Sequence, residues 1–373
     1  MKKLITLILI LFINLSLWSQ GPDTPIPVSD KVKIGTLDNG LTYYLRENAK
    51  PEDKIELRLV INAGSILEDE KQLGLAHFLE HMAFNGTKSF AKNDIISFLQ
   101  SIGVESGADL NAYTSFDETV YILPIPLQNP ENLDKGFQVL KEMGYDMLLD
   151  PEEIDNERGV VLEELRLSLS AERRILEKTL ADELYGSKYV DRLPIGTKEV
   201  LENFTYDDLK RFYKKWYRPD LMAVVAVGDV SVDVMEEKVK QFFGDIPKPE
   251  TSIDRPVFNV PNHEDTKIAV ATDKEAQQTV VQVLYKDRED VTPKTTYMDY
   301  RNFMIDDLFS TMITNRLNEL VSSENPPFLY GFAQYGSTYA RSKKAYRSLA
   351  LTTPATVATS LTSLLVDNEP ARH

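Results

Sequence analysis

The stretch His77-Phe78-Leu79-Glu80-His81 contains two of the chain's four histidines, with a glutamate between them. On a helix, residues four apart lie on the same face, so both imidazoles can face a single metal ion. Glu80 is one turn from His77 and can reach a water molecule at the same ion. Zinc favours imidazole and carboxylate ligands with one position open for water, and H-x-x-E-H is a signature of zinc hydrolysis. The stretch therefore predicts a helix that carries a zinc site.

The residues around this stretch are apolar on almost every side of the expected helix, which we place at about residues 74–84. A helix that is apolar all round is buried. A surface helix can carry the same polar residues without a metal, but in a buried helix unpaired polar groups are costly. A metal ion is the partner that satisfies all of them at once. The apolar residues are Leu73, Leu75, Ala76, Phe78, Leu79, Met82 and Phe84.

A third zinc ligand has to come from elsewhere, and the acidic segment 150–165 is the best candidate. Asp150 suits the N-cap position and Pro151 the first helical position, which predicts a helix from Pro151 to about Ser168. Two of its glutamates, two turns apart, share one face of this helix. Spacing alone leaves four candidates open: Glu153, Glu157, Glu163 and Glu164.

Four segments of the chain resemble the pitrilysin/insulinase family of zinc metallopeptidases, the inverzincins, in the order in which that family carries them. This family includes pitrilysin, insulysin and the mitochondrial processing peptidase. The resemblance covers about residues 32–352, more weakly after 255, and matches the N-terminal portion of such chains. The segments are HFLEHMAFNGT at 77–87, NAYTS at 111–115, TVY at 119–121 and ERGVVLEE at 157–164.

The resemblance implies roles for individual residues. It implies one zinc ion per chain, held by His77, His81 and Glu164. Glu80 is then the general base, and Glu157 matches a second glutamate that supports the site. The separation between His81 and Glu164 is several residues longer than in the processing peptidases. An insertion is therefore expected between them, and Glu157 is the fallback third ligand.

The segment 109–114 matches the family's substrate-binding strand. The resemblance implies that Asn111 and Ala112 bind a peptide by strand addition, through backbone hydrogen bonds. The alternative interpretation is an ordinary edge strand.

The order of strand-like and helical segments predicts an α+β fold, a two-layer mixed sheet with helices packed on one face. The turn residues Asp38-Asn39-Gly40 predict a hairpin between the first two strands. The expected strands are 33–37, 41–45, 55–63, 109–114, 119–124 and 221–227. Besides the two helices above, helices are expected at 93–102, 132–148, 172–185, 206–216 and 232–243.

The chain is predicted to contain two domains. Residues 31–245 form the catalytic domain, and the proline-rich segment 246–258 is a linker. Residues 259–373 are expected to be a second domain of the same family fold, incomplete at its C-terminus. A C-terminal half or a partner subunit is therefore expected to complete the enzyme. The second domain's expected elements are strands 267–271, 279–285, 328–336 and 345–352 and a helix at 297–322.

The N-terminus has the pattern of a secretory signal peptide. Lys2 and Lys3 precede an apolar run, Leu4–Leu17, which is shorter than a membrane span. Residues 1–20 are the expected signal and residues 21–30 an extended lead-in. The chain has no cysteine, which excludes disulfides and a cysteine nucleophile. We expect a periplasmic or secreted protein with no stable membrane span after signal removal.

The charge balance and the motifs together limit the functions that this chain can have. The chain has 42 basic and 58 acidic residues, a formal net charge of −16, which disfavours nucleic acid as a partner. The motifs predict a zinc-dependent endopeptidase that hydrolyses peptides with a metal-activated water. The alternative is a non-catalytic homologue that binds peptides or scaffolds a partner. The presence of both histidines and Glu80 disfavours this alternative, whereas the expected lack of a C-terminal half favours it.

Overall fold

A computed structural model describes residues 21–104, 111–249 and 253–367. The expected signal peptide, residues 1–20, lies outside the described residues. The chain divides into two compact units. The first unit is Ser29–Glu275, and the second consists of the residues from Ala276 onward together with the segment that precedes Ser29.

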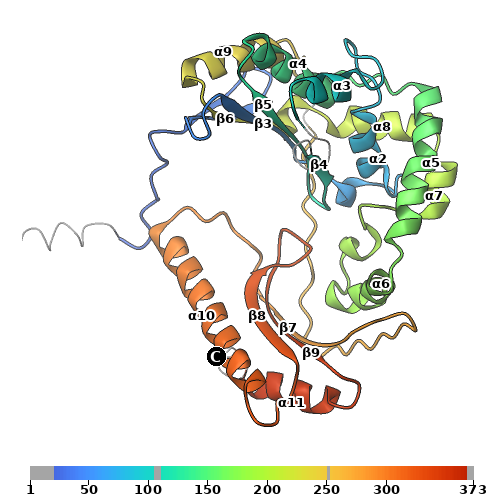
Figure 1. The fold of residues 1–373 in the computed structure, drawn as a ribbon, viewed down its shortest axis with the longest axis vertical. Helices are drawn as coiled ribbons and strands as arrows, with labels where there is room; N and C mark the ends of the chain where they lie inside the picture. The colour runs from blue at the N-terminus through green and yellow to red at the C-terminus, as the bar shows by residue number, and fades with distance from the viewer. Residues whose placement is uncertain (1–20, 105–110, 250–252, 368–373) are drawn as a thin grey trace, which may run out of the picture. The chain divides into compact units, whose positions relative to one another are not determined.

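The first unit is built on a six-stranded sheet with the order β1-β2-β6-β3-β5-β4 (Figure 1). β2 and β6 run parallel, and every other neighbouring pair is antiparallel. The predicted α+β class with a mixed sheet is therefore confirmed. The strands are β1 (Lys33–Thr36), β2 (Thr42–Glu47), β3 (Lys54–Ile61), β4 (Asn111–Thr114), β5 (Thr119–Pro126) and β6 (Met222–Gly228).

The helices of the first unit form two groups. α4 and α9 pack on each other and on the sheet, whereas α2 packs between β4 and the helices α5 and α8. The α-helices are α2 (Leu75–Met82), α3 (Asp94–Ser101), α4 (Glu131–Tyr145), α5 (Pro151–Ser168), α6 (Ala171–Glu183), α7 (Lys198–Asn203), α8 (Tyr206–Trp216) and α9 (Val232–Phe243). Three short 3-10 helices are η1 (Ser65–Leu67), η2 (Lys188–Asp191) and η3 (Pro219–Leu221).

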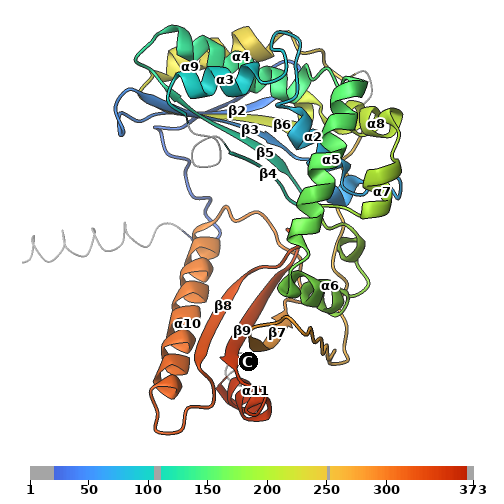
Figure 2. The same ribbon diagram turned by 45° about the vertical axis from the view of Figure 1, so that its right-hand side comes forward.

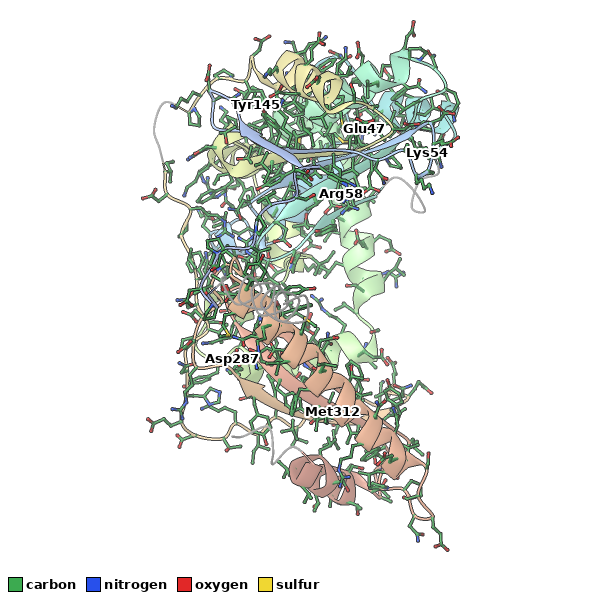
Figure 3. All side chains as sticks on the ribbon, turned by 90° about the vertical axis from the view of Figure 1, so that its left-hand side faces the viewer. Glu47, Lys54, Arg58, Tyr145, Asp287 and Met312 are labelled. Carbon is green, nitrogen blue, oxygen red and sulfur yellow. The ribbon has the colours of Figure 1, made fainter. Side chains whose placement is uncertain are left out.

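The alternation of residues in β3 shows which face of the sheet the helices α4 and α9 cover. Leu59 is fully buried, whereas Glu56 and Arg58 are exposed and form an ion pair with each other. Arg58 is labelled in Figure 3, and Figure 2 shows α4 and α9 on one side of the strands. α4 lies so close to the sheet that a Cβ on Gly144 would meet Cδ2 of Leu59 at 2.5 Å. Glycine at this position therefore permits the close packing.

The second unit contains a three-stranded antiparallel sheet with the order β7-β9-β8. Its elements are β7 (Thr279–Lys286), α10 (Tyr297–Val321), β8 (Tyr330–Ser337), β9 (Lys344–Thr352) and α11 (Val357–Asp367). The segment before Ser29 pairs with the start of α10, since the amide of Ile26 donates to the carbonyl of Thr295 at 2.7 Å. The core of this unit consists of Val281, Ile313, Leu317, Phe328, Ala333, Tyr346, Ala350 and Leu364.

One expected strand is wrong. Residues 267–271 form neither helix nor strand, and Ile268 and Val270 are 82% and 86% exposed. Their alternating apolar pattern suits a strand only where a neighbouring strand edge supplies backbone hydrogen bonds. In the described residues no strand lies beside this segment. Among the described residues, no helix has the length and apolar character needed to cross a membrane.

Candidate active site

Helix α2 presents both histidines of the H-x-x-E-H motif to α5. Nε2 of His77 lies 3.6 Å from Oε1 of Glu164, and Nε2 of His81 lies 3.3 Å from Oε2 of the same carboxylate. The three candidate ligand atoms all lie within 4.8 Å of one another. The imidazoles are mostly buried, whereas the side chain of Glu164 is 47% exposed. The group is therefore open to solvent on the side of Glu164.

The contacts of the four glutamates that are candidates for the third ligand distinguish them from one another. Glu157 lies against the other nitrogen of His81, with its Oε1 2.7 Å from Nδ1. Glu163 points outward and forms an ion pair with Arg166 at 2.6 Å. The remaining candidate, Glu153, forms an ion pair with Lys92. Of these four acids, Glu164 is thus the one whose carboxylate faces both histidines.

The donor set fits a zinc ion. Two imidazole nitrogens and one carboxylate are a set that catalytic zinc sites use, with the remaining position left for water. Glu157 accepts a hydrogen bond from Nδ1 of His81, which leaves Nε2 of that ring available for a metal. Asn85 in turn holds Glu157, donating to its Oε2 at 2.6 Å. Nδ1 of His77 is buried and has no hydrogen-bond partner in the described residues.

The two imidazoles differ in charge when no metal is bound. Burial, and then the charge of His81, lower the pKa of His77 to about 4. Burial also opposes the charged form of His81, but hydrogen bonds to Glu157 and Glu164 outweigh it and raise its pKa to about 9. His77 is therefore neutral and His81 protonated at neutral pH. A metal that binds both has to displace the proton of His81.

Glu80 is buried beside this group, with 8% of the residue exposed. Burial raises its pKa, and the hydroxyl of Thr114, which donates to Oε2 at 2.6 Å, offsets part of that rise. Thr114 is the last residue of β4, so one hydrogen bond joins the edge strand to Glu80. Sequence reasoning did not single out Thr114, although it belongs to the NAYTS segment that carried the resemblance.

A pair of buried tyrosines also lies near Glu80. The hydroxyls of Tyr121 and Tyr217 are 3.1 Å apart. Burial raises the pKa of both phenols, and the negative charge of Glu80 adds to that rise. Both hydroxyls therefore stay protonated beside Glu80 at neutral pH. Sequence reasoning missed Tyr217, because nothing in its local sequence indicates that it meets Tyr121.

β4 is the terminal strand of the six-stranded sheet. Asn111 pairs with Ile122 and Ala112 pairs with Tyr121 on β5. Among the described residues no strand pairs with the opposite edge of β4. Its backbone therefore has the position that peptide recognition by strand addition requires.

Comparison with known protein families identifies the family of this chain. Residues 43–198 match the model of the insulinase family, peptidase family M16, and residues 203–323 match the model of the M16 inactive domain. The chain belongs to the insulinase family. The zinc-type motif and both candidate glutamate ligands lie within the first match, so the resemblance carried by those motifs is confirmed at the level of the family.

The curated relatives of this chain include zinc proteases. It is 38% identical over 295 residues to a zinc protease PQQL-like of Arabidopsis thaliana, covering 79% of this chain and 31% of that protein. It is 35% identical over 322 residues to the probable zinc protease PqqL of Haemophilus influenzae, covering 86% and 35%. The chain thus spans about a third of the length of these relatives.

A solved structure shows the same fold. The first half of the periplasmic protease PqqL from Escherichia coli superposes with a TM-score of 0.83 at 28% identity. The match covers 92% of this chain and 73% of that one. Pitrilysin, at 21% identity and a TM-score of 0.68, shares the fold. The chain is therefore homologous to M16 zinc proteases and corresponds to part of the first half of PqqL.

Proposed function

We propose that this chain carries the catalytic zinc domain of an exported endopeptidase. The observation that carries the proposal is the convergence of His77, His81 and Glu164, with Glu80 buried beside them. Zinc bound by these side chains would supply a Lewis acid for the scissile carbonyl and for a water molecule. Homology to zinc proteases supports the same assignment.

The side chains near the metal site and the strand β4 have separate roles in the proposed reaction. Glu80 takes a proton from the attacking water and later delivers a proton to the leaving amine. Its raised pKa brings a carboxylate closer to the range in which it can do both. Glu157 fixes the orientation of His81 by accepting from Nδ1. In this scheme Asn111 and Ala112 bind the peptide along the open edge of β4, next to the hydroxyl that holds Glu80.

The proposal includes further polypeptide, a C-terminal half or a partner subunit, that completes the second unit. The order β7-β9-β8 repeats the order β3-β5-β4 of the first unit, again with every pair antiparallel. In the first unit β6 pairs with the other edge of β3, whereas no strand lies beyond β7 in the described residues. The edge of β7 is therefore placed to accept an antiparallel strand.

A stripe on α10 supports the same conclusion. Tyr300, Met304, Leu308 and Met312 recur every fourth residue and are 55%, 48%, 59% and 68% exposed. Met312 is labelled on this helix in Figure 3. In the first unit α2 packs against α5 and α8, and both follow α4 in the sequence. A polypeptide that brought equivalent helices would cover the α10 stripe, and a contiguous apolar surface of this kind favours such a partner.

Export is part of the proposal. The basic and apolar pattern of the N-terminal residues is that of a secretory signal. The related PqqL of Escherichia coli is described as periplasmic. We infer a periplasmic or secreted location for this chain.

Elemental analysis joined to a peptide-cleavage assay tests the proposed function. We expect one zinc per purified chain, and cleavage, with or without the completing polypeptide, that stops on chelation and returns with zinc. His81→Ala should lower zinc to a small fraction of one equivalent. A chain that binds peptides but neither holds zinc nor cleaves them would support the non-catalytic alternative instead.

A further inference from the structure

Glu68 is a fully buried acid outside the group of candidate metal ligands. Its Oε2 accepts a hydrogen bond from the amide of Gly74 at 3.0 Å, and its Oε1 accepts from the amide of Ala76 at 2.8 Å. These amides lie at the start of α2, where the N–H groups have no partner within the helix. Gly74, the N-cap residue, has no side chain to fill that role. Glu68 therefore caps the helix from a distance.

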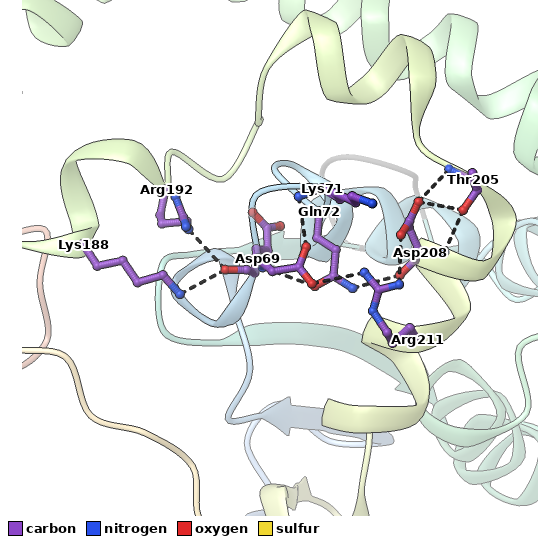
Figure 4. Close-up of polar contacts among 9 residues, drawn as sticks. Asp69, Lys71, Gln72, Lys188, Arg192, Thr205, Asp208 and Arg211 are labelled. Carbon is purple, nitrogen blue, oxygen red and sulfur yellow. Dashed lines mark hydrogen bonds and ion pairs between the residues drawn. The ribbon is translucent and has the colours of Figure 1, made fainter.

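The backbone around Glu68 is itself held in place. The carbonyl oxygen of Glu68 accepts from Nζ of Lys188 at 3.0 Å and from Nε of Arg192 at 3.2 Å. Nζ of Lys188 also donates to the carbonyl of Ile66 at 2.7 Å. Figure 4 shows Lys188 and Arg192 reaching into this loop from one side. One segment, more than a hundred residues further along the chain, thus holds the backbone at this acid.

The same loop is held on its other side by α8. Nε2 of Gln72 donates to the carbonyl of Asp208 at 3.0 Å, and Arg211 contacts both Asp208 and Asp69 (Figure 4). The first turn of α2 is also tightly packed, because a Cβ on Gly196 would meet Cα of Gly74 at 2.4 Å. The start of α2 is therefore closely packed against neighbouring backbone, and the side chain of Glu68 accepts from two of its amides.

The motif lies directly behind this cap. His77 follows Ala76, whose amide Glu68 binds, and α2 has only 8 residues. Short helices are marginal without external support. Burial raises the pKa of Glu68 to about 8, and the two amide donors oppose that rise, so the cap rests on these hydrogen bonds and not on a full negative charge. A change in the first turn would rotate all three side chains of the motif relative to α5.

We propose that Glu68 is a positioning residue for the metal centre, which sets the start of α2 and thereby the directions of His77, Glu80 and His81. This inference rests on the proposed function. It makes the capping side chain of Glu68 a determinant of zinc affinity and turnover, in addition to its contribution to folding.

Glu68→Gln tests the proposal with almost no change in shape. An amide oxygen can accept one of the two backbone bonds, while its NH2 group faces the other N–H donor. We expect zinc affinity to fall by about tenfold or more, as for other groups that orient metal ligands. With zinc saturating, kcat should fall and KM change little, because the backbone of the substrate strand β4 is held by its pairing with β5. Glu237→Gln is the matched control, since that residue is exposed on α9, outside the loop that holds Glu68.

Zinc affinity is measured by competition with a chromophoric chelator, which does not depend on turnover. A purely structural role would lower Tm but leave zinc affinity and the kcat of the folded protein unchanged, and that result would overturn the inference. If Glu68→Gln does not fold, Lys188→Met removes one anchor of the same carbonyl and should weaken zinc binding in the same direction. A wild-type chain without zinc affinity would refute the proposed function itself, and with it this inference.

Discussion

Oε1 of Glu157 lies 2.7 Å from Nδ1 of His81, on the opposite side of the ring from Glu164. This contact gives the two glutamates of one helix face different tasks. Glu157 binds the nitrogen that carries the proton, while Glu164 lies beside the nitrogen that is available to a metal. A carboxylate on the outer nitrogen fixes the tautomer and orientation of a ligating histidine.

The two glutamates should therefore differ in their effect on zinc. Glu164→Gln removes the proposed charged ligand and should lower zinc affinity by at least about a hundredfold, whereas Glu157→Gln should lower it by about tenfold. Glu163→Gln, which alters the exposed neighbour paired with Arg166, should have no effect. Zinc titration of the three variants makes the comparison. The reverse order for Glu157 and Glu164 would move the ligand role to Glu157.

Zinc affinity should rise with pH. Without metal, His81 is protonated up to a pKa of about 9, so zinc has to displace one proton. The apparent affinity should therefore increase by about tenfold per pH unit between pH 6.5 and 9 and level off above. His77, with its pKa lowered to about 4, stays neutral throughout this window. Titrations in zinc buffers at several pH values measure the slope, and a flat profile would contradict the account.

The same shift predicts the stability of the metal-free chain. A folded-state pKa raised above the ordinary value of His81 stabilises the fold most below about pH 6.5, and this contribution is lost as pH rises through about 9. Added zinc should thus raise Tm more at pH 9 than at pH 6.5. In Glu157→Gln the pKa of His81 should fall, which moves both effects to lower pH.

Thr114 should control the acid limb of the pH–activity profile. Its hydroxyl lowers the pKa of Glu80, so Thr114→Val should raise that pKa further. A base with a higher pKa stays protonated up to a higher pH. The acid limb of the kcat/KM profile should therefore shift to higher pH. Thr114→Ser keeps the hydroxyl and should retain the wild-type profile. If the acid limbs of the Thr114→Val variant and the wild-type protein fall at the same pH, Thr114 does not act on Glu80.

The chain studied alone should self-associate through its second unit. The exposed α10 stripe favours contact with any apolar surface, including a second copy. Leu308→Lys and Met312→Lys together should shift the protein toward monomer in analytical ultracentrifugation. Val257→Lys, at a site in the first unit that is 73% exposed, is the control. A wild-type chain that stays monomeric at about ten times the concentration used for peptide cleavage would contradict self-association through the α10 stripe.

Much of this fold could be predicted from local sequence. α5 begins at Pro151 as predicted, because Asp150 caps it and accepts from the amide of Glu152 at 2.9 Å. The hairpin between β1 and β2 follows from Asp38-Asn39-Gly40, since Gly40 adopts a φ of +96°. The prediction of a strand at 267–271 is wrong, because a strand also needs a neighbouring strand to bond with, which its own sequence does not supply.

The site was less predictable than the fold. Spacing placed Glu157 and Glu164 on one face of α5 but could not say which of them faces the inner nitrogens, because that depends on how α5 packs on α2. Family resemblance favoured Glu164. The contacts of Thr114 and Glu68 were missed, since one crosses between separate elements and the other binds backbone amides that carry no sequence signal.

The most direct test of the central claim is Glu80→Gln, measured for both zinc content and peptide cleavage. Glu80 is proposed as the general base and not as a ligand. The variant should therefore keep one zinc per chain and lose about a hundredfold to ten-thousandfold in kcat relative to the wild-type chain under the same conditions. Loss of the zinc would make Glu80 a ligand, and undiminished cleavage with zinc in place would contradict its role as the base.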